Sequence, residues 1–211
     1  LDKLTEIYCF VDDFLKLHPK VSEWRKSNHR NPRFSDSEIL TIALMQSEFG
    51  VESLRKTYSL IAENFGEEFP QLCGYKQFIR RLHRLTMIVQ MLFEQTSSFY
   101  TSDVYLLDAK PIPVCQTARH RRVRLLREDG AYFGKTSKGW FFGFKLHVLT
   151  TAEKKICQAV LTPGNYADRT IAEGLTEFLY SQTVIGDLGY RGEKLQTELF
   201  EQNNCLLITK Q

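Results

Sequence analysis

The sequence has no pair of cysteines at CxxC spacing, although five cysteines occur among its 211 residues. Zinc fingers and haem attachment sites need closely spaced cysteines, so both are excluded. A scattered, odd-numbered set favours a reduced, cytosolic setting over a disulfide framework. The chain also lacks the run of about 18 apolar residues that a membrane-spanning helix requires. Acidic residues throughout "LDKLTEIYCFVDDFL" argue against a secretory signal. We therefore expect a cytoplasmic protein with no membrane partner.

The overall charge is nearly balanced, at +3, but one segment is strongly basic. Residues 115–139, "CQTARHRRVRLLREDGAYFGKTSKG", contain only two acidic residues, Glu128 and Asp129. The basic residues of this segment are Arg119, Arg121, Arg122, Arg124, Arg127, Lys135 and Lys138. The segment is either an ordinary solvated loop or a surface that contacts phosphate groups, where such side chains supply affinity but not sequence specificity.

Residues 1–100 are predicted to form a helical N-terminal region. Apolar residues recur at helical spacing, and "SDSEILTIALMQSEFG" opens with Ser35 and Glu38 at capping-box spacing and closes on Gly50. A longer helix is expected from about Tyr75 to Tyr100. The two helices on either side of Gly50 are in keeping with a helix-turn-helix that recognises DNA ends. Paired amphipathic helices are also common in packing or dimerisation modules, and this alternative stays open.

Residues 101–211 are predicted to form an α/β domain. A short apolar run, "DVYLLDA", is followed by two β-rich stretches that suggest a hairpin, and then by helix, strand, helix and strand. Short apolar strands separated by helices indicate parallel neighbours, and right-handed crossovers place the first strand beside the fourth. This order is that of a ribonuclease-H-like core with a mixed sheet, lacking only a closing helix after the last strand.

Two of these strands end on an aspartate, "VYLLD" on Asp108 and "TVIGD" on Asp187. We expect Pro111 and Pro113 to end the first strand, so that Asp108 lies at an open edge. Adjacent strands are about 4.8 Å apart, so the two carboxylates would repel each other unless a cation lay between them. Oxygen ligands of this kind suit Mg²⁺ or Mn²⁺. Taken singly, each aspartate is equally typical of a turn or a helix cap.

Four segments, in order, resemble one family: "LLDAKPIPVC", "GWFFGFKLHVLTT", "LTPGNYADRT" and "VIGDLGYRG". They are similar to the catalytic core of bacterial insertion-sequence transposases of the DDE class. More narrowly, they resemble the insertion-sequence family numbered nine-eight-two, in which D-x-x-P-I-P-V-C, Y-x-G-x-K-x-H, L-T-P-G-x-x-x-D and G-D-x-x-Y segments follow one another.

The resemblance implies a ribonuclease-H-like fold and a metal-binding Asp-Asp-Glu triad, with DNA as the partner and a homodimer or larger assembly on it. The enzyme would cleave phosphodiester bonds at transposon ends and transfer the strand to target DNA, in the bacterial nucleoid. Asp108 matches the first carboxylate and Asp187 the second. The third has no counterpart, because Glu193, Glu198 and Glu201 fall before the last strand. The alternative is an incomplete transposase that only binds DNA.

Several other residues are candidates for contact with DNA. Beside the basic segment, they are Lys110, Lys145, His147 and Arg191. Lys145 and His147 alternate on one strand, and either line the active-site edge or face solvent on a hairpin. Asp168 is interpreted as the cap of the following helix in preference to a metal ligand. Trp140, Phe141 and Phe142 are interpreted as packing residues and not as groups that stack on bases.

Overall fold

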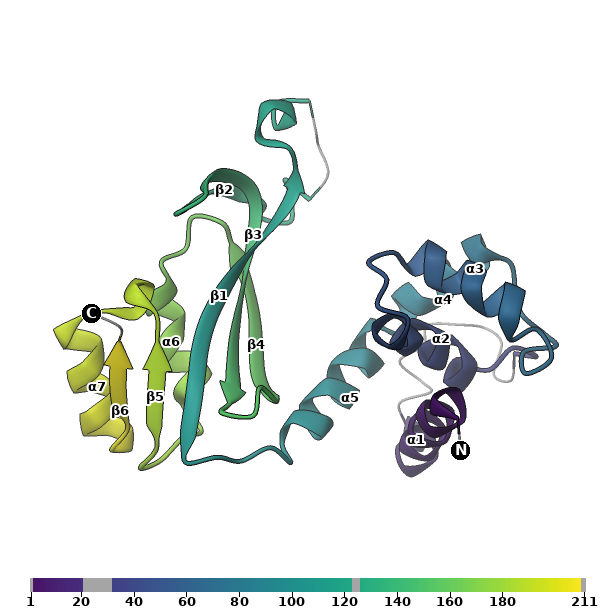
Figure 1. Ribbon diagram of the computed structural model, residues 1–211, viewed down its shortest axis with the longest axis horizontal. Coiled ribbons are helices and arrows are strands. Elements are labelled where there is room, and N and C mark those ends of the chain that lie inside the picture. The colour runs from purple at the N-terminus through teal and green to yellow at the C-terminus, as the bar shows by residue number, and fades with distance from the viewer. Residues whose placement is uncertain (1, 21–31, 123–125, 210–211) are drawn as a thin grey trace. The chain divides into compact units, whose positions relative to one another are not determined.

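The computed structural model describes residues 2–20, 32–122 and 126–209. The chain forms two compact units, Leu1–Glu94 and Gln95–Gln211 (Figure 1). No helix in the described part of the chain is both long enough and apolar enough to cross a membrane.

The first unit is entirely helical in its described parts. Its helices are α1 (Lys3–Leu17), α2 (Asp36–Glu48), α3 (Leu54–Asn64), α4 (Tyr75–Arg84) and α5 (Thr86–Ser97), the last of which runs into the second unit. The predicted capping box is confirmed at α2: Oγ of Ser35 accepts from the Glu38 backbone at 3.1 Å, and the Glu38 carboxylate accepts from the Ser35 backbone. Gly50 follows α2 with a φ of +60°, the left-handed conformation that glycine adopts readily.

The single long helix expected from Tyr75 to Tyr100 is wrong, because two helices occupy this segment. The chain turns at Leu85, whose φ and ψ are −93° and 6°, and α5 ends at Ser97. Leu85 and Ile88 are almost completely buried in the same core as Phe78. The turn therefore lets the apolar residues of both helices reach one core, which a straight helix would not allow.

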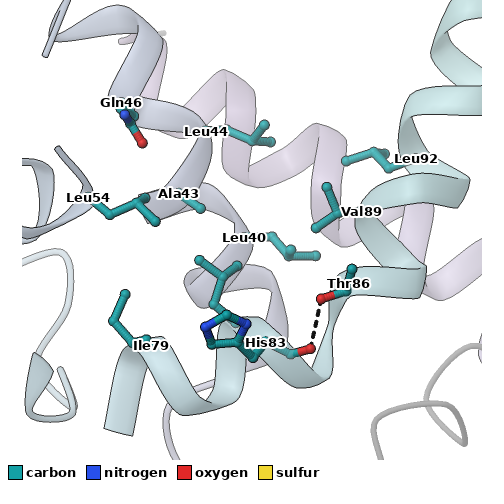
Figure 2. A pocket seen from close by; sticks show the side chains of 11 residues that line it. Leu40, Ala43, Leu44, Gln46, Leu54, Ile79, His83, Thr86, Val89 and Leu92 are labelled. Carbon is teal, nitrogen blue, oxygen red and sulfur yellow. Dashed lines mark hydrogen bonds between the residues drawn. The ribbon is translucent and has the colours of Figure 1, made fainter. Parts of the chain in front are cut away.

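A cavity of about 380 Å³ lies between helices of this first unit (Figure 2). Its wall is almost wholly apolar, with Leu40, Leu44 and Val89 among the lining residues. His83 and Thr86 lie at its edge, where the Thr86 hydroxyl donates to the His83 carbonyl at 2.8 Å. The cavity contains no carboxylate in its wall and is not the site predicted from the two aspartates.

The second unit is built around a mixed six-stranded sheet in the order β2-β3-β1-β5-β6, with β4 also paired to β3. Its strands are β1 (Val104–Cys115), β2 (Tyr132–Thr136), β3 (Gly139–Thr151), β4 (Ile156–Pro163), β5 (Thr183–Gly186) and β6 (Leu206–Thr209). The pairs β1–β5 and β5–β6 are parallel, and the others are antiparallel. The predicted hairpin is β3–β4, whereas β2 lies inside the basic segment and was not predicted.

Helices cover one face of this sheet (Figure 1). Helices α6 (Asp168–Thr176) and α7 (Glu193–Asn203) bury Leu175 and Leu199 against inward-facing strand residues such as Leu107 and Val184. Side chains alternate between faces along a strand, so Ile185 and Ile208 point to the opposite face. They are 41% and 46% exposed. Among the described residues of this unit, helices therefore pack on one face of the sheet and not on the other.

The prediction that Pro111 and Pro113 end the first strand is wrong, because β1 continues through both to Cys115. On one side β1 pairs with β3 from Tyr105 to Cys115, but on the other it pairs with β5 only from Val104 to Leu107. Within the described residues, β1 is therefore an edge strand beyond Leu107. Proline is tolerated on such a strand when its missing N–H would face the unpaired side.

Candidate active site

Asp108 and Asp187 follow the last parallel pair of β1 and β5, in which Leu107 lies opposite Gly186. Both aspartates are exposed. Oδ1 of Asp108 accepts from the Ala109 backbone at 2.8 Å. Oδ1 of Asp187 accepts from the Gly189 backbone at 2.9 Å, as the N-cap of a short 3₁₀ turn, Leu188–Tyr190. The sheet thus brings the two carboxylates to one edge and orients each by a backbone hydrogen bond.

Within the described parts of the chain, neither Asp108 nor Asp187 forms an ion pair with a basic side chain. Carboxylate oxygens without a basic partner are suitable ligands for Mg²⁺ or Mn²⁺, which also bind water and phosphate oxygens. Within the described parts of the chain, no group of three or more His, Cys, Asp or Glu side chains is arranged to hold a metal ion. The exposed carboxylates of Asp108 and Asp187 are oxygen ligands of the kind that suits a divalent cation.

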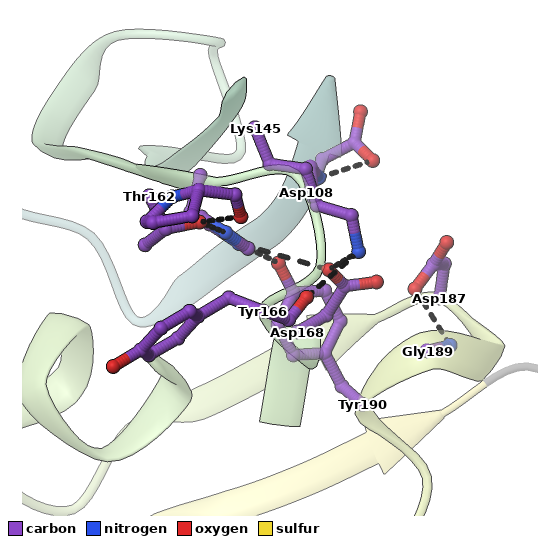
Figure 3. A network of polar contacts seen from close by, with 11 residues as sticks. Asp108, Lys145, Thr162, Tyr166, Asp168, Asp187, Gly189 and Tyr190 are labelled. Atoms are coloured by element: carbon purple, nitrogen blue, oxygen red, sulfur yellow. Dashed lines mark hydrogen bonds and ion pairs between the residues drawn. The ribbon is translucent and has the colours of Figure 1, made fainter. Parts of the chain in front are cut away.

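Asp168 does not cap the helix that it begins, so this prediction is wrong. The N-cap of α6 is Ala167, and no side chain caps this helix. The Asp168 carboxylate instead accepts from Nζ of Lys145 at 2.8 Å, in an ion pair whose side chains are only 19% and 13% exposed. Lys145 also donates to the Tyr166 carbonyl at 2.9 Å. Figure 3 shows the side chains of Asp108, Lys145, Asp168 and Asp187 gathered at this edge of the sheet.

His147 lies in the interior, and its predicted contact with DNA is corrected on that ground. Its side chain is fully buried and lies on the helix-covered face of the sheet, opposite Ala109 in the ladder. Nε2 lies 2.9 Å from the Thr162 hydroxyl and Nδ1 lies 3.4 Å from the Tyr190 hydroxyl. Burial lowers the pKa of His147, partly opposed by the charge of Asp168. The ring therefore links β3 and β4 to the turn that follows Asp187.

The pKa of Tyr190 is affected by three acidic side chains at this site. Its ring is completely buried below the turn that carries Asp187. Burial raises the pKa of the Tyr190 hydroxyl, and the carboxylates of Asp168, Asp187 and Asp108 raise it further. Three acidic groups from β1, α6 and the end of β5 therefore act on one hydroxyl. The segment "GDLGY" was the only sequence signal for this tyrosine, and it did not indicate the hydrogen bond to His147.

The candidate DNA-contacting residues have different surroundings. Those exposed to solvent are Lys110, Arg119, Arg121, Arg122, Arg127, Lys135, Lys138 and Arg191, and Arg124 lies outside the described residues. Arg127 lies 5.5 Å from the centre of the Phe142 ring and donates to the His120 carbonyl, so it holds the segment together. Phe141 and Phe142 are buried, but Trp140 is 62% exposed with Nζ of Lys135 at 5.7 Å from its ring. The expected packing role therefore does not extend to Trp140.

Comparison with family models matches residues 99–211 to the family described as transposase DDE domain. This match covers more than half of the chain. The chain belongs to the transposase DDE domain family. Membership implies nucleotidyl transfer on DNA as the chemistry of the domain and DNA as its partner. Searches of curated proteins and of solved structures found no match.

Proposed function

We propose that the protein is the DNA transposase of a bacterial insertion sequence, related to the family numbered nine-eight-two, and that its second unit is a ribonuclease-H-like core. The observation that carries the proposal is the pairing of Leu107 with Gly186, which puts Asp108 and Asp187 side by side at an exposed edge. Membership of the DDE family supports the same chemistry. The reaction is cleavage of a phosphodiester bond followed by strand transfer.

In this proposal Asp108 and Asp187 hold Mg²⁺ or Mn²⁺ through carboxylate oxygens, with the DNA phosphate completing the set of ligands. When bound, divalent cations activate the attacking water or hydroxyl and stabilise the leaving oxygen. The backbone hydrogen bonds from Ala109 and Gly189 fix the orientation of the two carboxylates. The buried His147 and Tyr190 hold the turn after Asp187 from below.

The basic segment and its neighbours bind the DNA backbone in this proposal. Lys110 lies two residues beyond Asp108 on the same face of β1, and Arg191 follows the turn that carries Asp187. Lys135, Lys138 and the arginines of the basic segment extend the positive surface away from the carboxylates. We further propose that the helical unit, with α2 and α3 on either side of Gly50, recognises DNA ends or pairs with a second copy.

A second candidate function is DNA binding without cleavage. It is favoured by one observation: the described residues contain no acidic group of three that could hold a metal ion. A transposase triad needs a third carboxylate, and α7 places Glu193, Glu198 and Glu201 before β6, as the sequence predicted. The two candidates differ in whether the bound strand is cut.

One experiment tests the proposal and separates the candidates. The DNA that flanks this coding sequence is labelled, incubated with the protein and Mg²⁺, and analysed for strand cleavage. Cleavage is expected in the wild type and absent in Asp108→Asn and Asp187→Asn. Asp103→Asn, which changes an exposed aspartate just before β1, is the matched control and should cleave normally. Cleavage by either active-site variant rejects the assignment, and binding without any cleavage supports the second candidate.

A further inference from the structure

The ion pair between Lys145 and Asp168 is not explained by the two-aspartate site alone. An aspartate in the first turn of a helix usually interacts with the free backbone N–H groups there. Asp168 has this position in α6 but no capping hydrogen bond. Its carboxylate is instead paired with a lysine 23 residues earlier in the chain, on β3. The fold therefore pairs Asp168 with the ammonium group of Lys145 instead of with the backbone at the start of α6.

Lys145 is held by two of its three N–H groups. One hydrogen bond runs to Asp168 at 2.8 Å and another to the Tyr166 carbonyl at 2.9 Å. An ammonium group has three donors, so the hydrogen bonds described for Lys145 leave one N–H for a further acceptor. The Lys145 side chain is only 13% exposed. Because its ammonium group also makes these two hydrogen bonds, the group is held in one position.

The ion pair also lies against the turn that carries Asp187. A Cβ placed on Gly189 would be 2.5 Å from Oδ2 of Asp168 and 3.1 Å from Oδ1 of Asp187. The carboxylates of Asp168 and Asp187 therefore both lie close to Gly189. One oxygen of Asp168 faces Lys145 and the other faces the Asp187 turn, so the lysine is tied to the edge where a DNA phosphate would have to enter.

We propose that Asp168 is a positioning residue of the transposase site. It orients Lys145 so that the remaining N–H group binds a phosphate oxygen of the DNA strand that lies at Asp108 and Asp187. The inference rests on the proposed function, which it deepens by naming the contact that Asp168 makes effective. Asp168 acts through Lys145 and does not itself touch DNA.

The sign of one effect distinguishes this role from simple charge repulsion. Removing a negative charge near bound DNA normally strengthens binding, because repulsion with the phosphates is relieved. If Asp168 orients a phosphate-binding lysine, its neutralisation weakens binding instead. Each phosphate contact also contributes about 0.9 to the slope of log K against log salt concentration. Loss of one contact therefore lowers that slope by about one, which a change confined to folding would not do.

The experiment measures binding of a fluorescein-labelled, mixed-sequence DNA duplex to the full chain by anisotropy over a series of salt concentrations. Lys145→Met and Asp168→Asn should each weaken binding several-fold and lower the slope by about one. The double variant should bind no more weakly than Lys145→Met alone, since both changes remove the same contact. Glu173→Gln is the matched control: it neutralises an exposed carboxylate on α6 and should not weaken binding.

Tighter binding by Asp168→Asn, or multiplied effects in the double variant, would overturn the proposal. If Asp168→Asn alone does not fold, the double variant still decides, because it removes both charges of the pair together. Its affinity should then be no lower than that of Lys145→Met, and a lower affinity would show that Asp168 contributes independently of Lys145 and reject the positioning role. Mn²⁺ affinity, measured by titration calorimetry, should stay within about twofold of wild type in Asp168→Asn, and a loss as large as in Asp187→Asn would make Asp168 a ligand instead. Failure of the wild type to bind the duplex would reject the proposed function itself.

Discussion

Asp168 fills the space that a side chain on Gly189 would occupy: Oδ2 of Asp168 lies 2.5 Å from the position of a Cβ at residue 189. Nζ of Lys145 lies 2.8 Å from Oδ1 of the same carboxylate. The Asp168 carboxylate therefore cannot move away from residue 189 without breaking this ion pair. Gly189→Ala should therefore lower the free energy of unfolding by about 1–3 kcal/mol, the usual cost of overpacking. Urea unfolding measures the change.

Gly192→Ala is the matched control for this substitution. Gly192 lies three residues further along, in extended backbone, and a Cβ there would meet no atom within 4 Å. The control should unfold within about 0.5 kcal/mol of the wild type. Equal stability of the two variants would show that the Asp168 carboxylate is free to move away.

The capping box at the start of α2 gives a second prediction. Ser35→Ala removes the hydroxyl that accepts from the Glu38 backbone, and should destabilise the helical unit by about 1 kcal/mol. Ser53 is the N-cap residue of α3 but makes no capping hydrogen bond with its side chain. Ser53→Ala should therefore have almost no effect on thermal unfolding. A larger loss at Ser53 than at Ser35 would contradict the capping argument.

The buried His147 should make stability depend on pH. Because burial lowers its pKa in the folded protein, the unfolded chain binds the proton more readily than the folded one. The stabilising contribution is therefore complete above the ordinary histidine pKa of 6.5 and is lost as the pH falls below that value. His147→Gln keeps hydrogen-bonding groups but cannot take up a proton at these pH values. The difference in unfolding free energy between wild type and variant should shrink from pH 8 to pH 5, as measured in urea, and a constant difference would refute the argument.

The exposed lysines of the β2–β3 hairpin should set part of the salt dependence of DNA binding. Replacing Lys135 and Lys138 together with glutamine should lower the slope of log K against log salt concentration by about two, if each contacts one phosphate. Lys194→Gln changes an 89% exposed lysine on α7, outside the basic segment, and should leave the slope as it was. Equal slopes for all three proteins would remove the hairpin from the DNA interface.

The parts of the fold that could be predicted from sequence are those that depend on local patterns. The capping box at Ser35 needs only four residues, and the β3–β4 hairpin needs two β-rich stretches and a short polar link. The break at Leu85 had no local signal, because Leu85 is a good helix former and the turn exists to serve a shared core. Strand β2 was not predictable for a similar reason. Its charged and glycine residues are not typical of a strand, and it forms by pairing with the beginning of β3.

The candidate site was predictable only as far as chain order determines it. Asp108 lies within β1 and Asp187 directly follows β5, and the apolar run before each aspartate predicted the neighbouring strands but not that β1 continues beyond Asp108. Asp168 was not, because its partner Lys145 lies 23 residues away and the pairing depends on how α6 meets β3. The burial of His147 likewise depends on which face of β3 the helices cover. Alternation along a strand indicates that two residues share a face, but not which face is packed.

The unequal pairing along the two sides of β1 has a mechanical consequence. As far as Leu107 the strand is paired on both sides, and beyond it β1 pairs within the described residues with β3 alone. The outer half of β1, together with β2 and the first half of β3, therefore extends past the parallel strands, with Asp108 as the first residue beyond them. In the proposed complex, a load on Lys135 and Lys138 of β2 and the following turn, such as a bent duplex, would act on the part of the sheet that contains Asp108 more directly than on β5, which Asp187 follows.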